Sequence, residues 1–271
     1  MIPTLTLALS LLVLGDAPAS ELPELTAREV FLDGLEAFES GEKRPFLEAI
    51  DTFVAVQLAR TDRRTDTVGA RKALVLGLCA LCDIEGFLRS NRLTREAFTS
   101  IVKGPDEARR QLRIAGGMSI ESRADSVRHF FSSAALTILF GPFIAERIGK
   151  QKEIEDAKRR ELEPTKGGYS FHDVAHNLAG IRFACWVTGW RDDSRLRRPP
   201  PPFRAFLPSF RAIELPKPLS WSEFRTRYQG ENRAAYDALI TGIREHLRRS
   251  LDAALAPSPP KGRGPRDSSQ D

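Results

Sequence analysis

The residues that decide the fold are DSVRHFFSSAALTILFGPFIAERIGKQKEIEDAKRRELEPTKGGYSFHDVAHNLAG, positions 125–180. Within them an uncharged run, Phe130 to Ala145, follows Asp125 and His129 and precedes a charged stretch. Asp125 and His129 are four residues apart, so they share one face of a helix. The pattern predicts helices that carry polar side chains beside apolar surfaces.

Two more helices are expected in this stretch. Glu153 and Asp156, three residues apart, face one way on a charged helix. After a glycine pair, Ser170 and Asp173 form an acidic variant of the capping box, which begins another helix. Asp173 and Asn177 then lie near one face of that helix.

The uncharged run Phe130 to Ala145 is slightly short for a membrane span and contains Pro142. A buried core helix is therefore the favoured interpretation, and a membrane-inserted helix is the alternative. Gly180 and Ala184 are small, so a neighbouring helix could approach them closely.

The N-terminal half also has helical periodicity. Residues 26–40 begin with a capping box, and Pro45 starts the next helix. A third apolar helix is expected over about 68–89, and shorter helices begin near Thr94 and Pro105.

The C-terminal part reads differently. Arg191 to Pro202, which ends in four prolines, predicts an extended linker. Ser220 caps a short helix, a longer helix covers about 231–255, and Pro, Gly, Ser and charge from Pro257 onward predict disorder.

No alternating β-branched run interrupts these patterns, so an all-α multi-helix bundle is predicted. The helices that bear His129, Glu153 and Asn177 are expected to pack together as a central polar trio. The predicted organisation is 1–19 signal peptide or anchor, 20–117 N-terminal helical region, 118–190 helical core, 191–255 linker and C-terminal helices, and 256–271 disordered tail.

The chain carries 41 basic and 36 acidic residues, a net charge of +5, which describes a mixed, solvated surface. Its short basic clusters, Lys158–Arg160 and Arg195–Arg198, have no interleaved aromatic residues on which bases could stack. Nucleic-acid binding is therefore not expected. These clusters are solvated faces or contacts for an anionic membrane surface.

The N-terminus predicts export. An apolar run, Thr4 to Gly15, precedes Ala17-Pro-Ala19, which has the small-x-small form of a signal-peptidase site. No Lys or Arg precedes the run, so an uncleaved anchor and a buried N-terminal helix are the alternatives. We expect a periplasmic or envelope location.

The chain has 3 cysteines. Cys79 and Cys82 have C-x-x-C spacing and could pair in an exported protein. Their apolar surroundings favour the role of small core residues.

The order Asp125…His129, then Gly149-Lys-x-Lys-Glu153-x-x-Asp156, then Ser170-x-x-Asp173-x-x-x-Asn177-x-x-Gly180 resembles the YfiM-type family of predicted periplasmic lipoproteins. More distantly it is similar to the VanZ-like envelope proteins. The resemblance covers about a fifth of the chain and implies an envelope location but no chemistry. The positions that match the family's polar signature are Asp125, His129, Glu153, Asp156, Asp173 and Asn177.

Two interpretations of these six residues compete. Four carboxylates, one His and one Asn on facing helices could bind a divalent cation or perform acid–base chemistry. Alternatively they form a buried hydrogen-bond network that fixes helix register, with Asp173 partly used in capping. His172 and His176 could join the site if their helix were rotated. No third ligand accompanies them in the sequence, so the favoured interpretation is that both are surface histidines, either exposed or hydrogen-bonded.

Three functions follow. The favoured one is an exported, envelope-associated binding or scaffold protein, because the sequence has no recognisable nucleophile, complete metal-ligand motif or cofactor loop. The second is a metal-assisted or acid–base hydrolase that uses His129, Glu153 and Asp173. The third is a membrane-inserted envelope protein whose apolar run faces lipid.

Overall fold

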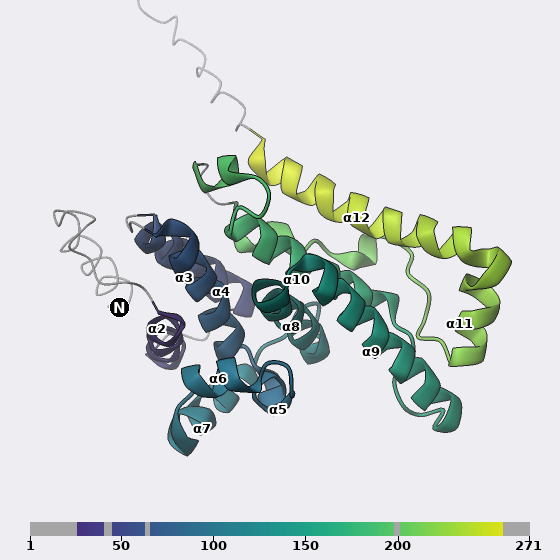
Figure 1. Cartoon of the computed structure of the whole chain (residues 1–271), viewed down its shortest axis with the longest axis horizontal. Coiled ribbons are helices and arrows are strands. Elements are labelled where there is room, and N and C mark those ends of the chain that lie inside the picture. The colour runs from purple at the N-terminus through teal and green to yellow at the C-terminus, as the bar shows by residue number, and fades with distance from the viewer. Residues whose placement is uncertain (1–25, 41–44, 63–65, 198–200, 257–271) are drawn as a thin grey trace, which may run out of the picture.

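A computed structural model describes residues 26–40, 45–62, 66–197 and 201–256 of the chain. Throughout these ranges the fold is all-α, with 3-10 turns and two isolated β-bridges but no strand, which confirms the predicted class. In Figure 1 the helices α2 to α7 gather at one end of the molecule and α11 lies at the other, with α8 to α10 between them, and α12 runs along one edge from α11 back past α10. The predicted signal segment, 1–19, and the tail after Ala256 lie outside the described residues.

The N-terminal helices form as their capping signals predict. Thr26 and Glu29 make the reciprocal capping box of α2, because each backbone N–H donates to the other side chain, at 2.6 and 3.1 Å. These helices are α2 (Ala27–Ser40), α3 (Phe46–Thr61), α4 (Thr67–Leu81), α5 (Phe87–Ser90), α6 (Arg95–Ile101) and α7 (Gly104–Ala115).

The single helix predicted over 68–89 is wrong at its C-terminal end. α4 ends at Leu81, and the chain turns through Glu85 and Gly86, whose φ angles are 59° and 68°. Asp83 then accepts the backbone N–H of Leu88 at 2.7 Å, which supports the start of α5. The apolar periodicity continues through this turn, so it hides the break.

Three helices form the centre: α8 (Ala124–Phe140), α9 (Pro142–Leu162) and α10 (Phe171–Val187). They carry His129, Glu153 and Asn177 respectively and pack against one another, with α8 and α10 in the most extensive contact. The predicted central trio is therefore present.

The uncharged run does not form one helix. Gly141 ends α8 with a φ of 84°, and Pro142 opens α9. Upstream of this corner Phe130, Phe131 and Ala134 are buried in the main core, as the core-helix interpretation expects. Among the described helices none is both long and apolar enough to cross a membrane.

The C-terminal part wraps the central helices. Asp193–Arg197 is a 3-10 helix, so part of the predicted extended linker is helical, and residues 198–200 lie outside the described ranges. Further 3-10 turns at Phe203–Phe206 and Phe210–Ala212 lead to α11 (Trp221–Tyr228), which has the predicted capping box at Ser220, and to α12 (Arg233–Leu255).

A buried guanidinium and an aromatic contact join segments that lie far apart in the sequence. Arg71 on α4, fully buried, pairs with Asp62 at 2.6 Å and donates to the carbonyl oxygens of Val187 and Leu196 at 3.1 and 3.2 Å. Phe203 packs edge-on against Phe130 of α8, with ring centroids 5.3 Å apart. These contacts hold the end of α10 against α4 and the turn at Phe203 against α8.

Gly180 sets the distance between α8 and α10. A Cβ atom built on Gly180 would lie 2.0 Å from the carbonyl oxygen of Phe130 and 3.2 Å from the backbone nitrogen of Ala134. The two backbones therefore touch, as the small residue in the sequence predicted.

We expect Gly180→Ala to lower the free energy of unfolding by about 1–3 kcal/mol, the usual cost of overpacking, because α8 must move away from α10. Gly242→Ala is the matched control: Gly242 is an exposed helical glycine of α12 with nothing within 4 Å of the added atom. It should gain up to about 1 kcal/mol from helix propensity. Urea titration of both variants measures the difference, and equal effects would contradict the close contact.

Candidate functional site

Three of the predicted polar residues meet at the N-terminal ends of α8 and α10. Nε2 of His129 lies 3.6 Å from an Asp125 carboxylate oxygen and 3.7 Å from an Asp173 oxygen. One ligand atom from each residue lies within 4.8 Å of the others. His129 and Asp173 are buried, and the Asp125 side chain keeps 36% of its surface exposed, so the cluster, hereafter the triad, reaches solvent on the Asp125 side.

The other edge of the His129 ring is held by a hydrogen bond. Nδ1 lies 3.1 Å from Oδ1 of Asn177, and the Ser133 hydroxyl donates to the same oxygen at 2.9 Å. Because a carbonyl oxygen only accepts, this network assigns the proton to Nδ1. The Nε2 edge of His129 faces the two carboxylates, and the hydrogen bond at Nδ1 fixes the ring in the way that metal-binding histidines are fixed.

Glu153 completes the N-terminal cap of α10. The Ser170 hydroxyl accepts the backbone N–H of Asp173 at 3.2 Å, and the Ser170 backbone N–H donates to Glu153 of α9 at 3.1 Å. The expectation that the Asp173 carboxylate is partly used in capping is therefore wrong. Because Glu153 takes that position from another helix, the Asp173 side chain is free to face His129.

Glu153 is a neutral acid at pH 7. Burial, and then the charge of Asp173, raises the pKa of Glu153 to about 9. Its second oxygen, Oε1, is buried without a hydrogen-bond partner and lies 3.9 Å from His129 Nδ1. Glu153 thus stands behind the imidazole, on the side away from the two aspartates.

Two arginines that the sequence interpretation missed hold the aspartates. Arg123 donates to Asp173 at 2.8 Å and lies 3.7 Å from an Asp125 oxygen. Arg128 hydrogen-bonds to Asp125 and lies 3.6 Å from a Glu85 oxygen. The contact between Arg128 and Asp125 follows from their spacing of three residues on one helix. No spacing in the sequence predicts that Arg123 bridges α8 and α10.

Asp156, predicted as a site residue, does not join the triad. It is paired along its own helix with Lys152 and lies 3.6 Å from Arg159. Glu153 and Asp156, predicted to share one helical face, thus have different surroundings. Glu153 is buried against α10, whereas Asp156 stays among surface cations.

His172 and His176 also remain outside the triad. The favoured surface location is wrong for His176, which is 1% exposed and donates from Nδ1 to the His172 carbonyl oxygen at 2.7 Å. Its ring packs edge-on against Phe210 with centroids 5.0 Å apart. Burial lowers the pKa of His176 to about 4, so it is a neutral core residue at pH 7.

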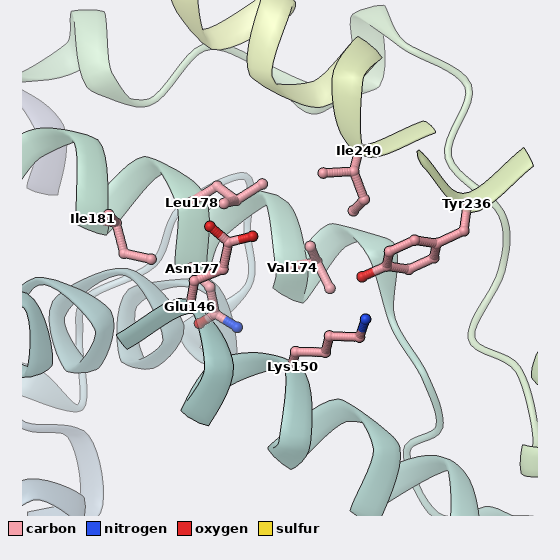
Figure 2. Close-up of a pocket in the computed structure, with 8 residues that line it drawn as sticks. All are labelled: Glu146, Lys150, Val174, Asn177, Leu178, Ile181, Tyr236 and Ile240. Atoms are coloured by element: carbon pink, nitrogen blue, oxygen red, sulfur yellow. The ribbon is translucent and has the colours of Figure 1, made fainter. Parts of the chain in front are cut away.

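Asn177 separates the triad from a shallow hollow. The hollow lies between α9, α10 and α12, and Figure 2 shows Asn177, Lys150 and Tyr236 on its walls. The Lys150 ammonium lies 4.7 Å from the centroid of the Tyr236 ring. Asn177, which bonds to Nδ1 of His129, lines the hollow, whereas no residue of the triad lines it.

The triad has the spacing of a metal site. Two ligands around a tetrahedral ion, each about 2.1 Å from it, are about 3.4 Å apart. The 3.6 and 3.7 Å separations from His129 Nε2 are close to that value. One imidazole and two carboxylates suit Zn²⁺ or Mn²⁺, and the exposed Asp125 side would leave a coordination position open to water.

No protein family, curated protein or solved structure with which the chain was compared matches it. The resemblance to the YfiM-type family therefore stays a prediction, and the site has to be interpreted from its own geometry.

We expect Glu153→Gln to flatten the pH dependence of stability in metal-free protein. The pKa of Glu153 rises from 4.5 in the unfolded chain to about 9 in the folded one, so the folded state holds the extra proton. The stability that this proton contributes is fully present below about pH 4.5 and is lost as the pH rises toward 9. Glutamine is neutral and can still accept the Ser170 N–H.

Glu155→Gln, at an exposed position on the same helix, is the control and should follow the wild type. Urea unfolding at several values between pH 4.5 and 9 measures the effect. A wild-type profile that parallels the Glu153→Gln profile would show that Glu153 is ionised when folded.

Proposed function

We propose that this protein is an envelope binding protein that holds a divalent metal ion on Asp125, His129 and Asp173. The observation that carries the proposal is the position of His129 Nε2, 3.6 and 3.7 Å from two carboxylate oxygens, while Nδ1 is held by Asn177. This is the orientation in which a neutral imidazole acts as a ligand.

The competing explanation is a network that only fixes helix register. A structural ion pair closes to about 2.7–2.9 Å, because short charge-assisted hydrogen bonds repay the burial of charge. The triad is open beyond hydrogen-bond distance at Nε2, whereas Arg123–Asp173 and His129–Asn177 are closed at 2.8 and 3.1 Å. The closed contacts surround the triad and fix its ligands, and the open centre is what a cation would fill.

The arginines set the expected affinity. Arg123 and Arg128 offset the charges of Asp173 and Asp125, and Glu153 is neutral. The net negative charge around a bound divalent cation would therefore be smaller than if Asp125, Asp173 and Glu153 were all unpaired carboxylates. We expect weaker binding than at a site with unpaired aspartates, and competition between the metal and Arg128, which donates to the same Asp125 oxygen that faces His129 Nε2.

Metal-assisted hydrolysis is the second candidate, and the exposed side of Asp125 favours it, because a metal-bound water there could meet a substrate. Glu153 does not fit the acid–base role first considered for it. It is fully buried, on the Nδ1 side of the ring, so a reaction at the open position would have to use the metal-bound water itself.

We expect chelator-treated protein to bind one equivalent of Zn²⁺ or Mn²⁺ by elemental analysis, and the Asp125→Asn and Asp173→Asn variants to lose it. Asp156→Asn, at the predicted site residue outside the triad, should bind like the wild type. Metal at 100 times its Kd should stabilise the wild type by about 2.7 kcal/mol.

Melting curves of each variant without metal separate the two explanations. Loss of metal with an unchanged metal-free melting temperature supports the site. Protein that takes up no metal, with both triad variants simply less stable than Asp156→Asn, would establish the register network instead.

Export is the other part of the proposal and is supported by the apolar N-terminus and Ala17-Pro-Ala19. In a Gram-negative host we expect the protein in the periplasmic or membrane fraction with its N-terminus at or near Ser20. N-terminal sequencing after fractionation checks this, and an intact Met1 in the cytosol would contradict it.

A further inference from the structure

An apolar patch covers the corner between α8 and α9, on the central helices but away from the triad. Phe143 is 69% exposed, more than any other large aromatic residue in the described ranges. Phe140, Ile144 and Trp190 are 42, 41 and 40% exposed. Together these four residues, hereafter the corner patch, account for half of the described large hydrophobic residues that are exposed.

The corner patch is one surface built from two segments. Trp190 follows α10, and its ring lies against Gly141, where an added Cβ would be 3.4 Å from Cη2 of the indole. Gly141 separates Phe140, the last residue of α8, from the first turn of α9. The positive φ of Gly141 therefore makes the turn between Phe140 and Phe143, and the indole of Trp190 packs on that turn.

A rigid support lies behind the corner patch. Leu136, Ala145 and Ile181, from α8, α9 and α10, form a small buried apolar cluster separate from the main core. Phe140 and Phe143 therefore stand on packed helices, and Trp190 lies in the turn directly after α10. Burying them by local rearrangement would disrupt this cluster, so their exposure is a property of the fold.

Two arginines flank the corner patch. The Arg147 guanidinium lies 5.7 Å from the centroid of the Phe143 ring, and exposed Arg191 follows Trp190 in sequence. Among the described residues neither arginine has an ion-pair partner within 4.0 Å. The nearest acidic positions in sequence, Glu146 and Asp192, are already paired with Arg244 and Arg195 at 2.6 and 2.9 Å.

We infer that the corner patch docks on a membrane surface that contains anionic lipid. Phe and Trp side chains favour the boundary between headgroups and acyl chains, and unpaired guanidinium groups bind lipid phosphates beside them. A bilayer accepts a protruding side chain such as Phe143 without a matching hollow, which a protein partner would have to provide. This contact is peripheral, and it does not depend on the metal site.

Co-sedimentation of the full chain with vesicles tests the inference. Wild-type protein should bind phosphatidylglycerol–phosphatidylcholine vesicles more strongly than vesicles of phosphatidylcholine alone. The double variant Phe143→Ser, Ile144→Ser should bind the anionic vesicles at least about tenfold more weakly, because two exposed apolar side chains no longer enter the interface. Arg147→Gln should reduce binding to anionic vesicles and leave binding to neutral vesicles unchanged.

Leu162→Ser is the matched control, because Leu162 is 84% exposed at the opposite end of the same helix. It should bind like the wild type, and circular dichroism should show the same helix content for all variants. Equal binding by the wild type and the double variant would overturn the inference, since another segment would then hold the membrane. An equal loss in Leu162→Ser, or a dimer that dissociates only in the double variant, would overturn it as well.

Discussion

The contact between Gly180 and the Phe130 carbonyl is the constraint on which the centre of the molecule depends. With no side chain at position 180, the backbones of α8 and α10 meet, and the polar residues one turn away come into register. Asn177 then reaches both Ser133 and His129 at hydrogen-bond distance. A wider separation of the helices would break both bonds, because neither donor is long enough to follow.

Because the buried Glu153 caps α10, the carboxyl group of Asp173 is available to face His129. Glu153 is uncharged in the core and accepts the Ser170 N–H, a task that a residue of α10 itself would otherwise perform. The Asp173 side chain therefore lies between Arg123 and His129. Burial thus keeps the Glu153 carboxyl group uncharged, whereas the side chains of Asp125 and Asp173 are held by arginines.

The helical fold could be predicted from the sequence, since periodicity and caps are local signals, and of the six named site residues the structure gathers all but Asp156 around the His129 ring. Asp125 and His129 share a helix, so their proximity follows from spacing alone. Asp156 and Glu153 have equally good spacing, yet which of them enters the core depends on the rotation of α9 against α10. The burial of His176 and the bridge from Arg123 to Asp173 also depend on tertiary packing, which a single sequence does not encode locally.

The helix α9 is continuous from Pro142 to Leu162, and it carries Phe143 at one end and Glu153 near its middle. At 1.5 Å per residue, these two positions are about 15 Å apart along the axis. The length of α9 therefore fixes the distance between the corner patch and Glu153. With the corner patch fixed on a planar surface, the tilt of α9 would set how far above that surface Glu153 stands, up to about half the thickness of the hydrocarbon layer.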